Sequence, residues 1–268
     1  MDKTKILITV KTYPTLTTNY EESVCTAGIT EEGNWIRICP IPYRSIDYSQ
    51  QYKKYDWIEV EIEKNKSDFR PESFKLKSLD SEIRIIDHLN TDNNWEKRKQ
   101  IVLKNVEYDL KKLINNAKDR KKLTSLSVFK PTKIIDFTFT SVSREWHSKK
   151  LKKLEQFNIF NNRGKVINKL PYKFLYIFED INKKESKMMI EDWEIGALYW
   201  KGLEIKNSEK EALNYVKEKY FDYMIKKCDL CFFLGTTKLH HLTSKNPFLI
   251  IGIFYPLLDK KIQHVFPF

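Results

Sequence analysis

The sequence predicts an α+β protein, in which a small β-barrel comes first, basic helices follow, and a compact α/β unit ends the chain. Short apolar strand patterns separated by turn signals fill the first part of the sequence. A helical spacing of apolar residues then replaces them, and mixed strand and helix patterns return near the end. We therefore expect two units, residues 1–92 and 93–268, packed together because no low-complexity linker separates them.

The first unit is expected to contain five short strands. They cover residues 6–10, 24–29, 35–39, 56–63 and 83–86. In the fourth, Ile58, Val60 and Ile62 alternate with glutamates, which indicates one buried face and one acidic face. Short strands with few helix signals between them favour a small, partly closed barrel.

A long amphipathic helix is expected to open the second unit. Asn93 is a suitable N-cap, and Glu96 stands three residues later at the capping-box position. One face repeats apolar side chains with helical spacing, namely Val102, Val106, Leu110, Leu113 and Ala117. The other faces are rich in lysine and arginine, and the helix should end near Ser125. A second, short basic helix is expected at 149–154.

The rest of the chain combines strands and a helix. Residues 172–178 and 187–190 are expected to pair as a hairpin. Ser208 and Glu211 form a second capping box, which opens a helix. Residues 228–234 and 248–255 are almost entirely apolar, a pattern typical of strands that are buried on both faces.

Charge is distributed unevenly along the chain, whose formal net charge is +12. Residues 1–92 contain 13 basic and 16 acidic side chains, and residues 170–268 contain 15 and 13. Residues 93–169 contain 20 basic and 7 acidic side chains, so the middle of the chain holds the positive excess. A localised excess of this kind favours a polyanionic partner.

These observations favour a nucleic-acid-binding protein without catalytic activity, and they do not separate DNA from RNA. The lysines expected to bind phosphates are Lys111, Lys112, Lys121, Lys122, Lys149, Lys150, Lys152 and Lys153. Trp35 and Arg37, with Arg44 shortly after them, are candidates for contact with a base. The same charge also fits a solvated surface, or an adaptor that docks on an acidic protein partner.

A metal-dependent nuclease is an alternative. Asp180, Glu185 and Lys187 match an Asp and Glu-x-Lys arrangement, in which carboxylates hold Mg²⁺ and the lysine positions the attacking water. The short spacing between Asp180 and Glu185 favours a solvated hairpin tip instead.

A zinc site is a second alternative, because Cys228, Cys231, His240 and His241 are suitable ligand types. Positions three apart on a strand face opposite sides, so buried structural cysteines are the favoured interpretation. No cofactor is predicted.

The sequence contains no signal for export or for insertion into a membrane. No apolar run approaches the ~20 residues of a membrane span, and the N-terminus lacks a small-residue cleavage site. The four cysteines have no framework spacing. We therefore expect a protein of the reducing cytoplasm that has no membrane partner.

The chain resembles a group of uncharacterised bacterial proteins through motifs in both halves. The N-terminal motifs are Val24-Cys25-Thr26-Ala27-Gly28-Ile29, Gly33-Asn34-Trp35-Ile36-Arg37, Pro40-Ile41-Pro42-Tyr43-Arg44, Lys54-Tyr55-Asp56-Trp57-Ile58 and Arg70-Pro71-Glu72-Ser73. The C-terminal motifs are Asp192-Trp193-Glu194, Phe232-Phe233-Leu234-Gly235-Thr236 and Ile250-Ile251-Gly252. The resemblance implies no activity, although a recognition subunit of a bacterial assembly is compatible with it. The first unit is also similar to PUA-like and OB-like barrels, which bind RNA or modified bases.

Overall fold

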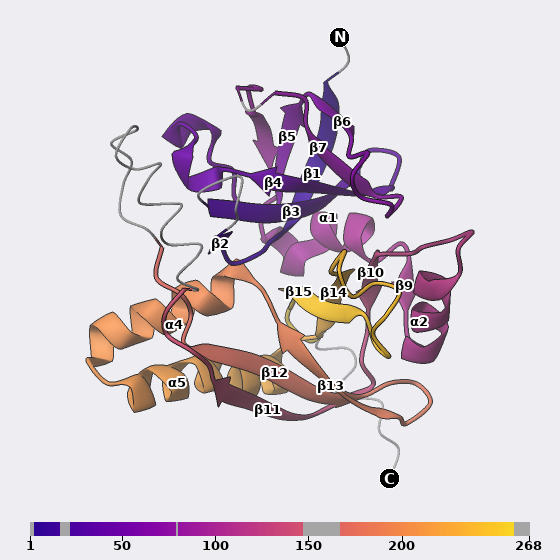
Figure 1. The fold of residues 1–268 in the computed structure, drawn as a ribbon. Coiled ribbons are helices and arrows are strands. Elements are labelled where there is room, and N and C mark those ends of the chain that lie inside the picture. The colour runs from indigo at the N-terminus through magenta and orange to yellow at the C-terminus, as the bar shows by residue number, and fades with distance from the viewer. Residues whose placement is uncertain (1–2, 17–21, 79, 147–166, 260–268) are drawn as a thin grey trace.

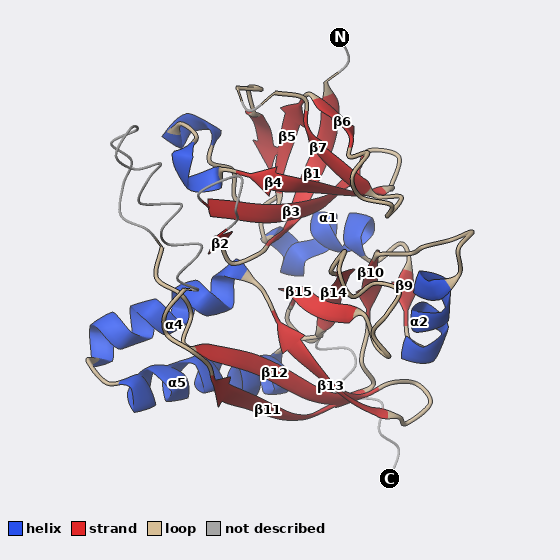
Figure 2. Ribbon diagram, viewed as in Figure 1, coloured by secondary structure: helices blue, strands red, loops and turns tan. Residues whose placement is uncertain are grey.

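The computed structural model describes residues 3–16, 22–78, 80–146 and 167–259. Two units are visible, each built on one β-sheet, and Figure 1 shows them one above the other. Helices and strands both contribute extensively (Figure 2), so the α+β class expected from the sequence is confirmed.

The first sheet has eight strands and curls into a half-barrel. The strands are β1 (Thr4–Lys11), β2 (Thr15–Leu16), β3 (Glu22–Thr30), β4 (Trp35–Ile41), β5 (Asp56–Val60), β6 (Ile62–Lys64), β7 (Ser73–Leu76) and β8 (Arg84–His88). Their order is β6-β7-β4-β3-β1-β5-β8, with β2 paired to β3. Two 3-10 helices, η1 (Tyr43–Ser45) and η2 (Tyr48–Gln50), follow β4. Aliphatic side chains such as Ile8, Ile58 and Val60 fill the inside of the curl.

The second sheet has seven strands, in the order β11-β12-β13-β15-β14-β10-β9. The strands are β9 (Val106–Glu107), β10 (Leu126–Phe129), β11 (Lys133–Ser141), β12 (Tyr172–Glu179), β13 (Glu185–Ile190), β14 (Cys231–Thr236) and β15 (Phe248–Phe254). The described helices are α1 (Asp92–Val102), α2 (Leu110–Lys118), α4 (Trp193–Lys206), α5 (Glu209–Lys217), the π-helical segment η3 (Glu218–Tyr223) and α6 (Met224–Lys227). Helix α1 lies between the two units, and α2 lies beside β9 (Figure 2).

Strands β14 and β15 are buried on both faces, as their apolar sequences predicted. Phe232 and Leu234 pack on the side of α4 and α5, within the core of the second unit. Phe233 and Ile251 project the opposite way and join a cluster that includes Leu7 of the first unit. The two units therefore share an apolar interface.

The single long helix expected from residue 93 to about 125 is wrong, because α1 and α2 take its place with β9 between them. Val106 pairs with Val128 of β10 in a parallel register, which removes it from any helix. Asp109 starts α2 anew by accepting a hydrogen bond from the Lys112 N–H at 3.0 Å. Asn93 has a positive φ of 48° and is no N-cap. Val106 is therefore part of a strand, because its pairing with β10 decides its conformation, although its apolar spacing is that of a helix.

Candidate nucleic-acid interface and interunit cavity

An exposed basic surface covers α2 and the turn that follows it. We call it the α2 surface, and its cations are Lys111, Lys112, Lys118, Arg120, Lys121, Lys122 and Lys245. Lys245 belongs to it because its carbonyl accepts a hydrogen bond from Lys118 Nζ at 3.3 Å. The lysines at 111, 112, 121 and 122 that were expected to bind phosphates lie together here. The other four, Lys149, Lys150, Lys152 and Lys153, lie outside the described residues.

Few carboxylates neutralise the α2 surface. Glu107 binds Lys112 at 2.8 Å. Asp109 caps α2, and the Asp119 carboxylate accepts the Lys121 N–H at 2.9 Å. Within the described part of the chain, none of the other cations of this surface lies within 4 Å of a carboxylate. Exposed, unpaired ammonium and guanidinium groups in one place are suited to binding phosphates.

Arg37 extends from β4 into the interface between the units. Its Nη1 donates to Ser125 Oγ at 2.8 Å, and its Nη2 donates to the Ser125 carbonyl at 3.1 Å. Burial lowers the pKa of Arg37 to about 9, and the neighbouring Arg70 contributes in the same direction. Arg37 is 5% exposed and its guanidinium is already hydrogen-bonded, although the residue lines a cavity.

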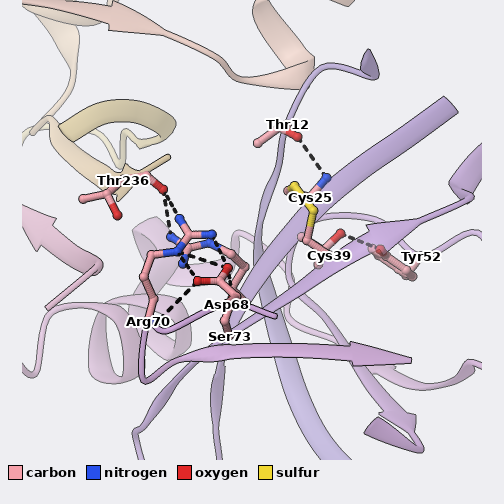
Figure 3. The surroundings of a disulfide bond; sticks show 10 residues. Thr12, Cys25, Cys39, Tyr52, Asp68, Arg70, Ser73 and Thr236 are labelled. Carbon is pink, nitrogen blue, oxygen red and sulfur yellow. Dashed lines mark hydrogen bonds and ion pairs between the residues drawn. A yellow bond between two sulfur atoms is a disulfide. The ribbon is translucent and has the colours of Figure 1, made fainter. Parts of the chain in front are cut away.

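Arg70 forms a second bridge between the units. It donates to the Thr236 carbonyl of β14, and its Nε and Nη2 bind Asp68 at 2.9 Å and 2.5 Å (Figure 3). Burial alone would raise the pKa of Asp68, but hydrogen bonds from Arg70 and Ser73 hold it well below its usual range. The sequence analysis did not predict this network, although Arg70, Ser73 and Thr236 all belong to the motifs through which the chain resembles the bacterial group.

Trp35 and Arg44 are placed differently from Arg37. Trp35 is half-buried and packs edge-on against Phe233, with ring centroids 6.0 Å apart. Arg44 binds Glu22 at 2.5 Å on the surface of the first unit. The three residues proposed for base contact are therefore not brought together as one group, and their role stays a prediction.

A cavity of about 560 Å³ lies between the two units. This volume falls in the range of roughly 300–1,000 Å³ that small-molecule sites occupy. Its walls combine apolar side chains with the rings of Tyr13, Trp146 and Tyr172. Two polar groups stand out in this lining. The Thr237 hydroxyl is buried without a hydrogen-bond partner, and burial raises the pKa of Glu191.

The loop after β14 links the lining of the cavity to helix α2. Thr236 Oγ1 and His241 Nδ1 are 2.7 Å apart, and His241 Nε2 lies 2.7 Å from the Ala117 carbonyl of α2. Since a carbonyl only accepts, Nε2 carries the proton and Nδ1 accepts from Thr236. His241 thus ties a cavity-lining strand to the basic helix.

A disulfide between Cys25 of β3 and Cys39 of β4 also lines the cavity (Figure 3). The cysteine spacing had not predicted it; pairing of β3 with β4 brings the two Cα atoms to 4.7 Å. Disulfides are more typical of oxidising compartments than of a reducing cytoplasm, so the expected location stays a prediction.

The three residues of the nuclease alternative lie in the β12–β13 hairpin, where Asp180 stabilises the turn. The Asp180 carboxylate accepts the backbone N–H groups of Leu110, Asn182 and Lys184 at 3.2, 2.9 and 3.1 Å. Glu185 and Lys187 lie on β13 with exposed side chains, and none of the three lines the cavity. Asp180 is thus engaged in holding the turn and the start of α2.

The residues of the zinc alternative are also separated. Cys228 and Cys231 are buried in two different apolar clusters, on opposite sides of the second sheet. His240 is exposed, and both nitrogens of His241 are hydrogen-bonded. Among the described residues, no three His, Cys, Asp or Glu side chains come together as metal ligands.

No helix in the described ranges is long and apolar enough to cross a membrane.

Fold and site define a two-unit α+β protein that has a ligand-sized cavity between its sheets and an exposed basic surface on α2. Residues 106–267 match the family described as Domain of unknown function (DUF8757), and the chain belongs to that family. Residues 2–104 match a second family, Domain of unknown function (DUF8758). The two matches meet on the C-terminal side of α1, and the boundary expected from the sequence, after residue 92, falls at the start of that helix and stays a prediction.

Curated proteins include no match to this chain. A solved structure of a murine DNA-binding protein with double-stranded DNA is similar over 97% of this chain and 96% of that one. The identity is 11% and the TM-score is 0.32, so this likeness carries no argument about function.

Proposed function

We propose that the protein binds nucleic acid without catalysing a reaction on it. The observation that supports this most directly is the α2 surface, where seven cations stand against three nearby carboxylates. Phosphates of a strand would bind there by charge, without dependence on base sequence.

We propose further that the interunit cavity receives one extruded base. Its volume, aromatic walls and few polar groups suit a planar ring with hydrogen-bonding edges. Arg37 and the unpartnered Thr237 hydroxyl would meet that ring. In this proposal the half-barrel would have the role that small PUA-like or OB-like barrels have when they hold single bases or strands.

Fluorescence anisotropy of labelled DNA and RNA across a salt series tests the phosphate contacts. The variant Lys111→Ala/Lys121→Ala/Lys122→Ala is compared with a control that removes the same charge from α4 and α5, Lys201→Ala/Lys206→Ala/Lys210→Ala. Three lost phosphate contacts should flatten the slope of log K against log salt by roughly 2.7 on duplex DNA. Equal binding by both variants would contradict the α2 surface as the interface. Absence of binding by the wild type would favour an acidic protein partner.

The cavity has its own test. A duplex carrying 2-aminopurine should brighten on binding, because that base fluoresces more strongly when unstacked. Thr237→Val removes one cavity hydroxyl and should reduce the brightening, whereas Thr243→Val, at an exposed site on the same loop, should not. Binding without any brightening would leave the α2 surface intact and refute base extrusion.

A further inference from the structure

A second cavity, of about 410 Å³, opens on the other side of the Asp192–Trp193 segment. Four aromatic rings line it, those of Tyr55, Trp95, Trp193 and Tyr255. Its positively charged lining residues are Lys11, Lys53, Lys54 and Arg98. It shares no lining residue with the first cavity and none with the α2 surface.

Arg98 is the most informative residue of this pocket, because it is 5% exposed and has no carboxylate partner. Its Nε donates to the Leu89 carbonyl at 2.7 Å, and Nη2 lies 3.4 Å from His88 Nε2. The guanidinium carbon lies 3.8 Å from the Tyr55 ring centre and 4.7 Å from that of Trp95. Within the described ranges, Nη1 makes no hydrogen bond and no carboxylate approaches within 4 Å. Buried charges are normally paired, so this one is suited to an anion that comes from outside.

Lys11, on β1, is a second cation of this pocket that has no carboxylate partner among the described residues. Its Nζ donates to the Tyr43 hydroxyl at 3.0 Å and lies 4.7 Å from the centre of the Trp193 ring. No carboxylate of the described chain lies within 4 Å of it. Burial, together with repulsion from Lys54, lowers the pKa of Lys11 to about 8. An anion near Nζ would favour the charged form of this lysine.

Lys54 differs because it is neutralised. Its Nζ binds Asp192 at 2.8 Å and Glu194 at 3.2 Å, so these two carboxylates are already occupied. Lys53, by contrast, is exposed at the mouth of the pocket, and its side chain makes no ion pair in the described structure. Lys11, Lys53 and Arg98 therefore leave a positive excess in the pocket.

The Tyr55 hydroxyl is an independent observation that points to a ligand site here. Tyr55 is 5% exposed, yet its hydroxyl has no hydrogen-bond partner. Leaving a buried hydrogen-bond donor unpaired costs free energy. Tyr55 and Trp95 also have positive φ values of 69° and 65°, which bulky residues rarely adopt. Strained backbone of this kind is concentrated at ligand sites.

We propose that this pocket binds a nucleoside monophosphate, with the base against the aromatic rings and the phosphate near Arg98, Lys11 and the Tyr55 hydroxyl. Aromatic walls suit the stacking of a base, and a guanidinium fork suits a phosphate. A free nucleotide and the 5′-phosphorylated end of a strand both present this chemistry. The proposal stands independently of strand binding by the α2 surface.

Isothermal titration of the full chain with AMP tests the proposal, with adenosine as the ligand that lacks a phosphate. AMP should bind, and adenosine should bind at least about tenfold more weakly, because hydrogen bonds to a charged phosphate are stronger than those to a neutral group. Tyr55→Phe removes only the unpartnered hydroxyl, so the fold should keep its stability while AMP affinity falls about tenfold. Lys53→Ala should also weaken binding, and Lys97→Ala, exposed on α1 outside the pocket, should not.

Competition between AMP and short oligonucleotides identifies the source of the ligand. Tighter binding of a 5′-phosphorylated oligonucleotide than of its 5′-hydroxyl form supports a strand end, and preference for AMP supports a free nucleotide. Absence of AMP and 5′-phosphate binding at millimolar concentration would overturn the proposal. Equal affinity of wild type, Tyr55→Phe and Lys53→Ala would overturn it as well, because binding would then lie elsewhere.

Discussion

Removing the charge of Asp68 should destabilise the protein strongly. Asp68→Asn keeps the shape of the side chain but takes away the negative charge that neutralises Arg70, which is 6% exposed. Arg37 is close enough to Arg70 for each positive charge to disfavour the other, and Glu72 would be the remaining carboxylate acting on Arg37. Removing one partner of a buried ion pair costs about 3–5 kcal/mol, because the other charge stays buried.

The expected effect is large enough to measure by thermal unfolding. In a chain of this size, 1 kcal/mol corresponds to about 2–4 °C, so Tm should fall by roughly 6–20 °C. Circular dichroism at neutral pH measures the change. Glu63→Gln is the control, since Glu63 pairs with Lys75 at 2.8 Å on the exposed side of the same unit and should cost less than about 1 kcal/mol. If both substitutions lower Tm equally, the buried network does not hold the units together as described.

The stabilising effect of the Asp68 carboxylate should also be visible in the dependence of the unfolding free energy on acidic pH. The pKa of Asp68 is lowered in the folded protein from the value of about 3.9 that an unfolded chain has. Its stabilising contribution is therefore complete above the unfolded value and is lost as pH falls toward the folded value. Wild type should lose stability faster than Asp68→Asn as pH is lowered below about 5 in urea titrations. Parallel losses in both proteins would refute the assignment.

Three further changes test the fold and the pockets. Gly28→Ala should lower the free energy of unfolding, measured in urea, by about 1–3 kcal/mol, because a Cβ there would meet the Leu7 carbonyl oxygen at 2.3 Å. The control is Gly33→Asn, in a turn with a φ of 87° and open space around it, which should change the free energy of unfolding little. In wild type, the folded state holds the Lys11 proton less tightly than the unfolded chain does, so the free energy of unfolding should rise between about pH 8 and 10.5. Lys11→Met should remove this rise. If the difference in unfolding free energy between the two proteins stays constant over that pH range, the burial of this amine is contradicted. Asp180→Ala should lower the free energy of unfolding by about 0.5–2 kcal/mol, because it removes hydrogen bonds to the hairpin turn and to the start of α2. Nucleic-acid affinity, measured by anisotropy, should stay unchanged. Mg²⁺-dependent cleavage that disappears in this variant would instead favour the nuclease alternative.

Local patterns were sufficient to predict many elements. The alternation around Ile58 and Val60 identified a strand with one buried face, and both side chains are buried in β5. The continuous apolar runs identified β14 and β15, because a strand between two packed layers needs no polar face. The helical spacing from Val102 to Ala117 predicted the wrong element at Val106, since pairing with β10 depends on a strand about twenty residues further along.

The sequence by itself determined the α+β class, the strong strands and the concentration of positive charge in the middle of the chain. It could not determine which charged residues are available to a ligand. Arg37 lies inside the interface and faces only the cavity there, whereas Lys111 and its neighbours stay exposed on α2. Only the tertiary structure placed Lys54 against Asp192, 138 residues away, and created a pocket on each side of that contact. Burial and pairing depend on packing between distant segments, and a list of residue types along one chain does not contain those distances.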